Sequence, residues 1–182
     1  MYFAIGVIAV LAIYLVASYN SLIGLRQRVR NSWAQVDVQL KRRYDLIPNL
    51  VNTVKGYAAH EKETFENVTK ARSMASSAQT VEDQAGAENM LTGALRQLMA
   101  VSERYPELKA DANFRQLQDE LTETEGKIAF SRQFYNDTVM KYNTTIQRFP
   151  TNIIAGMFKF FDEAYFNLDD NAAAREAVKV EF

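Results

Sequence analysis

Large apolar or aromatic side chains recur every seven residues in the C-terminal half of this chain. The positions are Phe114, Leu121, Ile128, Tyr135, Tyr142 and Phe149. A second row, mostly small and hydroxylated, lies three residues further along: Leu117, Thr124, Ser131, Thr138 and Thr145. A strict seven-residue period is typical of helices that pack in a left-handed, coiled-coil-like way. The pattern predicts a long helix that ends at Phe149–Pro150, with a row of small residues that another helix can approach closely.

A second apolar row, with helical spacing, lies nearer the N-terminus. Its members recur every three or four residues: Val29, Trp33, Val36, Leu40, Tyr44, Ile47, Val51 and Val54. This spacing indicates one face of a helix and not a strand. We expect one helix from the N-terminal residues to about residue 56. A kink or short break is expected at Pro48, because proline lacks the backbone donor and clashes with the preceding turn.

The first 25 residues carry no charged side chain. About 20 apolar residues cross a bilayer core about 30 Å thick, so residues 1–25 predict a transmembrane anchor. No Lys or Arg precedes the apolar core, which disfavours a cleaved signal peptide. The anchor is formed by apolar and aromatic residues, with the two outermost tyrosines placed at opposite interfaces: Tyr2, Phe3, Ile5, Val7, Ile8, Leu11, Ile13, Leu15 and Tyr19.

Charged residues are distributed unevenly along the chain, with a basic region after the anchor and an acidic region at the C-terminal end. Residues 26–43 carry six cations and one anion, whereas residues 162–182 carry six anions and two cations. Because all the nearby cations follow the anchor, the positive-inside rule predicts an outside N-terminus and a cytoplasmic C-terminal domain. Arg26, Arg28 and Arg30 follow the anchor directly, and we expect them to contact lipid headgroups, each contributing about 1 kcal/mol near the surface.

Three further cations, Lys41, Arg42 and Arg43, lie farther along the same predicted helix. An upright helix places them about 33 Å beyond Tyr19, which exceeds a screening length of about 8 Å. They cannot all share the buried face that contains Leu40 and Tyr44. We therefore expect these three cations to contact acidic partners, including the acidic tail of a neighbouring subunit.

Residues 149–161, FPTNIIAGMFKFF, contain too many large apolar side chains for one helix face: Ile153, Ile154, Met157, Phe158, Phe160 and Phe161. The segment is expected either to cap the end of the bundle, or to form a subunit contact or insert at the bilayer surface. The last residues, NLDDNAAAREAVKVEF, lack a sustained period and predict a flexible or extended arm. Phe182 in this arm is a further candidate for a subunit contact.

The composition excludes several kinds of chemistry. The chain has no Cys, so disulfides, thiolate metal sites and Cys nucleophiles are excluded. His60 has no nucleophile or activated partner nearby in the sequence, and Tyr57 three positions earlier breaks the Glu-x-x-His pattern of a di-iron site. A group of carboxylates then predicts a solvated face: Asp119, Glu120, Glu123 and Glu125. We expect no enzyme activity, no cofactor and no metal, and the net charge of −1 does not favour nucleic acid.

The remaining segments also predict helices, at about 61–77 and 81–104, with Pro106 at a new helix start. With 7 Gly and 3 Pro, the chain has too few turn signals for a sheet with many hairpins. The asparagines after Tyr135 and Tyr142 are candidates for interhelical hydrogen bonds, either inside the bundle or between subunits. The predicted fold is all-α: an N-terminal transmembrane helix that continues into an elongated antiparallel helical bundle with coiled-coil-like packing.

Three stretches carry a family resemblance. They are YNSLIGLRQRVRNSWAQVDVQLKRRYDLIPNLVNTVKGYAAHE at residues 19–61, YPELKADANFRQLQDELTETEGKIAFSRQFYNDTVMKYNTTIQRFPTNIIAGMFKF at residues 105–160, and EAYF at residues 163–166. In these stretches the chain resembles the LemA family of bacterial membrane-anchored helical proteins. The resemblance implies one transmembrane helix in the bacterial inner (cytoplasmic) membrane, an antiparallel bundle and no established enzyme activity. Related domains are implied to serve membrane organisation, including that of magnetosome membranes.

These observations predict three regions: an anchor at 1–25, a cytoplasmic LemA-like helical bundle at 26–161 and an acidic tail at 162–182. The function expected first is a non-enzymatic membrane-anchored scaffold that self-associates and organises the membrane or recruits partners. Its partners are then membrane lipids, further copies of the chain and other proteins. The alternative is a signalling or receptor-like adaptor that binds a soluble partner without large assembly.

Overall fold

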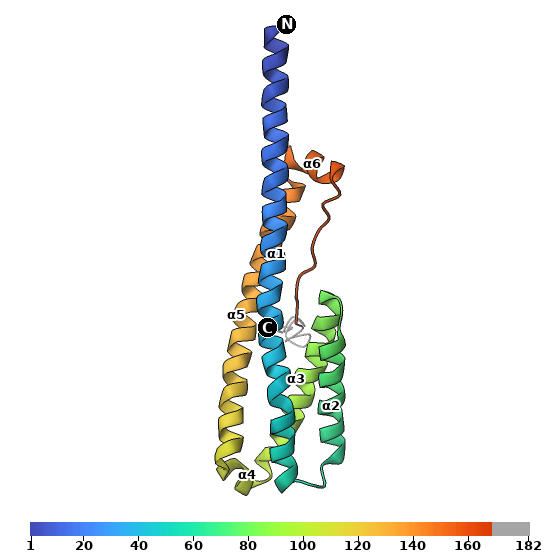
Figure 1. Ribbon diagram of the computed structural model, residues 1–182. Helices are drawn as coiled ribbons and strands as arrows, with labels where there is room; N and C mark the ends of the chain where they lie inside the picture. Colours follow the sequence, from blue (N-terminus) through green and yellow to red (C-terminus); the bar gives the residue numbers. More distant parts are fainter. Residues whose placement is uncertain (169–182) are drawn as a thin grey trace, which may run out of the picture. The chain divides into compact units, whose positions relative to one another are not determined.

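The structure is a computed structural model that describes residues 1–168. In this part of the chain there are helices and no strand, which confirms the all-α prediction (Figure 1). The helices are α1 Tyr2–Tyr57, α2 Lys62–Ser77, α3 Val81–Glu103, α4 Pro106–Ala110, α5 Ala112–Gln147 and α6 Thr151–Met157. The acidic tail beyond residue 168, with Phe182, lies outside the described residues.

The described residues form two compact units. Unit 1 comprises residues 1–40 and 126–165, and unit 2 comprises residues 41–125 with residues 166–168. Both long helices, α1 and α5, contribute one part to each unit. This grouping follows packing along the two long helices, and it is a different division from that into anchor, bundle and tail. The boundaries predicted at residues 25 and 161 therefore remain predictions.

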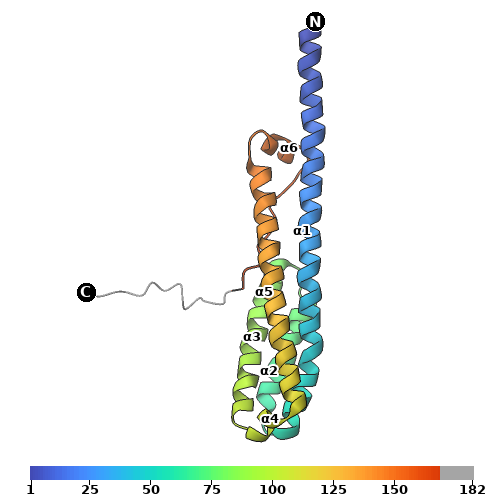
Figure 2. The same ribbon diagram turned by 90° about the vertical axis from the view of Figure 1, so that its left-hand side faces the viewer.

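In unit 1, the second part of α5 lies beside the first part of α1 (Figure 2). The Trp33 and Tyr135 rings are 5.2 Å apart. Tyr19, earlier in α1, meets Phe158, later in the chain, so the two helices run antiparallel here. The buried residues continue both predicted rows: Leu22, Leu25, Val29 and Val36 in α1, and Ile128, Ser131, Tyr135, Val139 and Tyr142 in α5. Phe149 leaves the seven-residue row with 81% exposure, because α5 ends at Gln147.

In unit 2, α2 packs against α3, and α3 contacts the short helix α4. The predicted inner face of α2 is buried, as is the apolar row of α3: Phe65, Val68 and Ala71, and Leu91, Leu95, Leu98 and Val101. The end of α1 adds Ile47, Leu50, Val51 and Val54, and α5 adds Phe114 and Leu121. The core of this unit is therefore apolar along four helices.

The helix ends follow local chemistry. Thr80 caps α3 by accepting a hydrogen bond from the Asp83 N–H at 3.0 Å, and Asp111 accepts one from the Phe114 N–H at 2.8 Å at the start of α5. Pro106 lies in the first turn of α4, where a missing N–H does not matter. The break expected at Pro48 is absent, since α1 continues through that residue to Tyr57.

Candidate functional site

The first 16 residues of α1 present apolar side chains outward. An 18-residue window of this helix has a mean hydropathy of 2.1, and none of it is buried. The side chain of Phe3 is 87% exposed and that of Ile13 is 70% exposed. Among the described residues this is the one helix long and apolar enough to cross a membrane. All the predicted anchor residues are exposed except Leu15 and Tyr19, which are half-buried.

Helix α6 lies beside α1 at the end of this apolar stretch (Figure 1). The Tyr14 hydroxyl lies 3.4 Å from the Thr151 hydroxyl. The Tyr19 ring lies 4.7 Å from the Phe158 ring and 5.9 Å from the Phe160 ring. The C-terminal end of the predicted anchor is thus the part of α1 on which the segment after α5 packs.

The segment 149–161 divides into two sets of side chains. Ile154, Ala155 and Phe160 are buried, so Ile154 and Phe160 are not available for the subunit contact that the sequence predicted. The other large apolar side chains are exposed: Phe149, Ile153, Met157, Phe158 and Phe161. The segment therefore caps unit 1 and also presents an apolar surface outward.

The three juxtamembrane arginines differ in their surroundings. The Arg26 guanidinium lies over the Phe160 ring, 5.0 Å from its centroid, which is a cation–π contact. Arg28 and Arg30 are exposed. Arg28 also lines a hollow of about 350 Å³ with Asp137 and Lys141. The guanidinium groups of Arg28 and Arg30 can thus face solvent or lipid headgroups, whereas that of Arg26 is in contact with the Phe160 ring.

Side chains of α5 hold the segment after α6 by hydrogen bonds to the main chain of that segment. The Asn143 side chain donates to the Glu163 carbonyl at 2.9 Å and accepts from the Glu163 N–H at 2.9 Å. The Tyr135 hydroxyl donates to the Ala164 carbonyl at 2.8 Å. The prediction of an interhelical bond is therefore wrong for Asn143, because its amide pairs with extended backbone. Burial, more than the nearby Glu163 carboxylate, raises the pKa of the Tyr142 phenol.

In unit 2, the Arg43 side chain is buried and does not face a partner. Its Nη1 lies 2.8 Å from Glu88 Oε2, and its Nη2 lies 2.8 Å from Glu125 Oε1 and 3.0 Å from the Thr92 hydroxyl. Arg43 is 2% exposed and Glu88 is fully buried. The expectation that Arg43 contacts another subunit is wrong, because two carboxylates of its own chain neutralise it.

The neighbouring cations Lys41 and Arg42 are exposed. They remain candidates for an acidic partner. Among the predicted solvated carboxylates, Glu125 pairs with Arg43 and still keeps 42% of its side chain exposed.

Tyr44 and Gln84 complete the buried network around Glu88. The Tyr44 hydroxyl donates to Glu88 Oε1, and Gln84 donates to the Tyr44 hydroxyl at 2.7 Å and to the Ala75 carbonyl at 3.0 Å. Burial, together with the Glu88 carboxylate, raises the pKa of Tyr44 far above its usual range. The phenol therefore stays protonated and acts as a hydrogen-bond donor, and not as an acid or base.

A sequence signal for this network exists and was missed. Gln84 and Glu88 lie seven and three residues before Leu91. They therefore continue the apolar row of α3 with helical spacing, which places both polar side chains on the buried face. His60, in contrast, is exposed. Within residues 1–168 no cluster of three or more His, Asp or Glu is placed to hold a metal.

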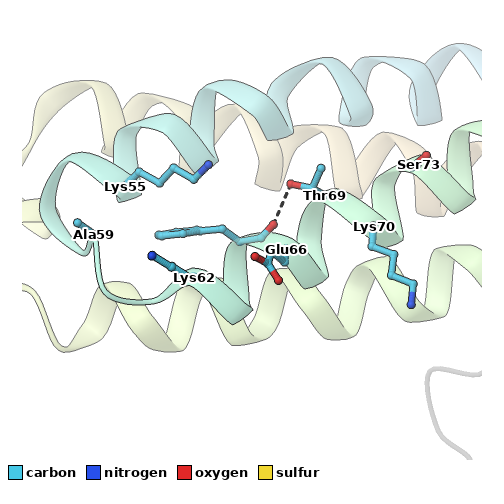
Figure 3. Close-up of a pocket in the computed structure, with 8 residues that line it drawn as sticks. Lys55, Ala59, Lys62, Glu66, Thr69, Lys70 and Ser73 are labelled. Carbon is cyan, nitrogen blue, oxygen red and sulfur yellow. Dashed lines mark hydrogen bonds between the residues drawn. The ribbon is translucent and has the colours of Figure 1, made fainter.

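Unit 2 also carries a surface groove, which Figure 3 shows in close-up. It has a volume of about 680 Å³ and is lined by the end of α1 and one face of α2: Lys55, Ala59, Lys62, Phe65, Glu66, Thr69, Lys70 and Ser73. Lys55 and Lys62 lie at one end and Lys70 toward the other (Figure 3). The Lys55 Nζ is 5.4 Å from the centroid of the Phe65 ring. The groove thus carries an excess of positive charge beside the buried Phe65, and its residues were not predicted from the sequence as a site.

Comparisons with known proteins identify one family and several relatives. The model of the LemA family matches residues 32–182 of this chain. Magnetosome protein MamQ 2 of Paramagnetospirillum magneticum is 26% identical over 194 residues, which cover 90% of this chain and 71% of that protein. Magnetosome protein MamQ of Magnetospirillum gryphiswaldense is 23% identical over 192 residues, with the same coverage. Protein LemA of Metamycoplasma hominis is 26% identical over 156 residues, covering 83% and 69%.

Proposed function

The chain belongs to the LemA family, and from that premise we propose that it is a non-enzymatic, single-pass membrane scaffold that self-associates. The observation that carries this proposal is α1. Its first 16 residues present an unpacked apolar surface, and the same helix continues into the packed cores of both units. A helix with this division is suited to hold a helical domain at a bilayer.

The proposed topology places the N-terminus outside and the rest of the chain in the cytoplasm of a bacterial inner membrane. Arg28 and Arg30 are exposed and follow the anchor directly. Their position supports the orientation through the positive-inside rule. A cysteine introduced at Glu66, which is exposed in unit 2, tests it because the chain has no other cysteine. An impermeant thiol reagent is expected to label it in inverted vesicles and not in intact cells.

Self-association is supported by apolar side chains that unit 1 leaves in solvent outside the anchor. Phe130 is 74% exposed and Phe134 is 47% exposed, one helical turn apart on α5. Contiguous exposed apolar surface marks interaction sites, whereas single exposed apolar residues are common on any protein. Several relatives are named magnetosome proteins, and we propose that this chain likewise serves to organise a membrane compartment.

Light scattering of the full chain in detergent tests the assembly. We expect particles heavier than one chain, and we expect Phe130→Ser with Phe134→Ser to reduce their mass. Met90→Ser is a matched control, because Met90 is 51% exposed on α3 of the other unit. A wild-type chain that stays strictly monomeric at high concentration contradicts the self-association.

A second candidate function is an adaptor that binds an acidic soluble partner, and the lysine-lined groove favours it. Three lysines against Glu66 complement an acidic peptide. Fluorescence anisotropy with a labelled Asp/Glu-rich peptide tests this in detergent. Lys55→Glu with Lys62→Glu is expected to abolish binding, whereas Arg96→Glu, an exposed charge reversal on α3, is expected to weaken it little. Equal losses in both variants indicate general charge attraction, and this adaptor function is then rejected.

A further inference from the structure

The large exposed apolar side chains of residues 149–161 are here called the α6 apolar patch. Its members are Phe149, Ile153, Met157, Phe158 and Phe161, with exposures of 81%, 55%, 64%, 45% and 74%. Single exposed apolar residues are common on soluble proteins, but five large ones within thirteen residues are not. The buried side chains of Ile154 and Phe160 pack this segment onto the rest of unit 1. The patch is therefore held in place and does not arise from an unpacked chain end.

The contacts of this segment with α1 fix its position along the predicted membrane anchor. The Thr151 hydroxyl lies 3.4 Å from the Tyr14 hydroxyl, and the Phe158 ring lies 4.7 Å from the Tyr19 ring. If Tyr19 marks the membrane interface, Tyr14 lies about 7 Å further into the bilayer, at about 1.5 Å per residue. Interfacial segments bury their apolar faces about 5–10 Å into the boundary between headgroups and acyl chains. With Tyr19 at the interface, Thr151 and Phe158 lie at that level.

The charges beside the patch fit an anionic lipid surface. Residues 149–161 contain a single charged side chain, the exposed Lys159, and Arg148 immediately precedes them. Asp162 and Glu163 immediately follow them, and the Asp162 carboxylate accepts a hydrogen bond from Gln147 at 3.0 Å. The Arg26 guanidinium lies 5.0 Å from the centroid of the buried Phe160 ring, in the same segment as the patch. Cations that border an apolar surface are the pattern by which amphipathic segments bind anionic membranes.

We propose that the α6 apolar patch inserts into the leaflet interface beside the anchor and forms a second membrane contact. This inference rests on the proposed membrane anchor and adds an element to it. The patch adjoins the apolar surface of α1, so a bilayer that covers one also reaches the other. A second copy of the chain that covered the patch would have to sit in the same interfacial layer. Lipid is therefore the occupant that the geometry favours.

The absence of cysteine makes a direct test possible. Met157→Cys in the full chain, labelled with an environment-sensitive fluorophore, reports on the patch. Met140→Cys is the matched control, because Met140 is 53% exposed on α5 of the same unit and is away from α6 in sequence. Ile8→Cys reports on the anchor itself. All three are reconstituted in vesicles of phosphatidylcholine and phosphatidylglycerol, with and without spin-labelled lipids as quenchers.

We expect lipid-borne quenchers to reduce the emission of the Met157 label, more strongly when the spin label is shallow than when it is deep. The Met140 label is expected to lose no emission, and the Ile8 label is expected to be quenched most by the deep spin label.

An Ile8 label that stays in water contradicts the membrane anchor and with it the proposed function. If Ile8 is quenched by lipid and Met157 is not, the second contact is wrong and the anchor stands. If Met157 is shielded from water but shows energy transfer to other copies without lipid quenching, a second subunit covers the patch and the inference is equally wrong.

Discussion

Arg72 of α2 donates a hydrogen bond from its Nε to the main-chain oxygen of Tyr44 in α1, at 2.7 Å. In an uninterrupted helix that oxygen accepts from the N–H four residues later. Here the residue four positions later is Pro48, which has no N–H. The guanidinium of a neighbouring helix thus replaces the donor that the proline lacks. This explains how α1 passes through Pro48 without a break.

The first prediction tests this replacement with a double-mutant cycle. Arg72→Ala is expected to lower the free energy of unfolding by about 1–2 kcal/mol, because it leaves the Tyr44 carbonyl without a donor. In a Pro48→Ala background the residue-48 N–H is restored, and the same substitution is expected to cost clearly less. Denaturant unfolding of the full chain in detergent, followed by circular dichroism, measures all four variants. Strict additivity of the two substitutions contradicts the pairing.

The second prediction concerns the buried pair of Arg43 and Glu88. Glu88→Ala is expected to cost about 3 kcal/mol, because it leaves a buried guanidinium with Glu125 as its one remaining carboxylate and removes the acceptor of the Tyr44 hydroxyl. Arg42→Ala removes the adjacent, exposed cation and is expected to change stability by no more than about 0.5 kcal/mol. The same unfolding experiment compares them. Similar costs for both would show that Arg43 is not structurally paired.

The third prediction concerns Asn143, which makes two hydrogen bonds with the main chain of Glu163. Asn143→Ala is expected to release residues 158–165 from α5, since both bonds are lost. Hydrogen exchange in detergent is expected to become faster in that segment, with little change in residues 114–128 of α5. Asn67→Ala removes an exposed asparagine of α2 and serves as the control. Unchanged exchange at 158–165 in Asn143→Ala contradicts a holding role.

The fourth prediction is a pH dependence at the start of α5. The Phe114 N–H, and after it the Tyr57 hydroxyl, donate to Asp111 and lower the pKa of its carboxyl. A lowered pKa in the folded state means that the stabilisation is present above the unfolded value of about 3.9 and is lost as the pH falls through the folded value. Asp111→Asn keeps a capping oxygen but does not titrate.

The midpoint of thermal unfolding, measured from neutral pH to below about pH 4, checks this pH dependence. The wild-type midpoint is expected to fall more on acidification than that of Asp111→Asn. Parallel pH profiles for the two proteins contradict the role of this carboxylate.

The positions of the helices could be predicted because their signals are local. The seven-residue row from Phe114 to Tyr142 and the row from Val29 to Val54 report which side of each helix is apolar, and the structure buries them. Helix ends at Thr80, Pro106 and Asp111 follow capping chemistry within a few residues. These features depend on neighbours three or four positions apart, so one sequence suffices to identify them.

The partners of the polar side chains could not be predicted in this way. Three adjacent cations, Lys41, Arg42 and Arg43, look equivalent in sequence, yet Arg43 is buried and the other two are exposed. The difference arises because Glu88 lies 45 residues away and reaches Arg43 only when α3 packs on α1. The α6 apolar patch is similar, since its division into buried and exposed side chains depends on how residues 149–161 fold back on Tyr14 and Tyr19.

By itself, the sequence determined that this chain is helical, that its first residues are apolar enough to span a bilayer, and which helix faces are apolar. Only the tertiary structure decided which charges are neutralised inside, how α1 passes through Pro48, and which apolar side chains remain outside. The physical reason is range. Helix formation and amphipathic spacing are set by residues within a turn of each other, whereas burial of a charge or exposure of an aromatic ring depends on contacts between segments that lie tens of residues apart.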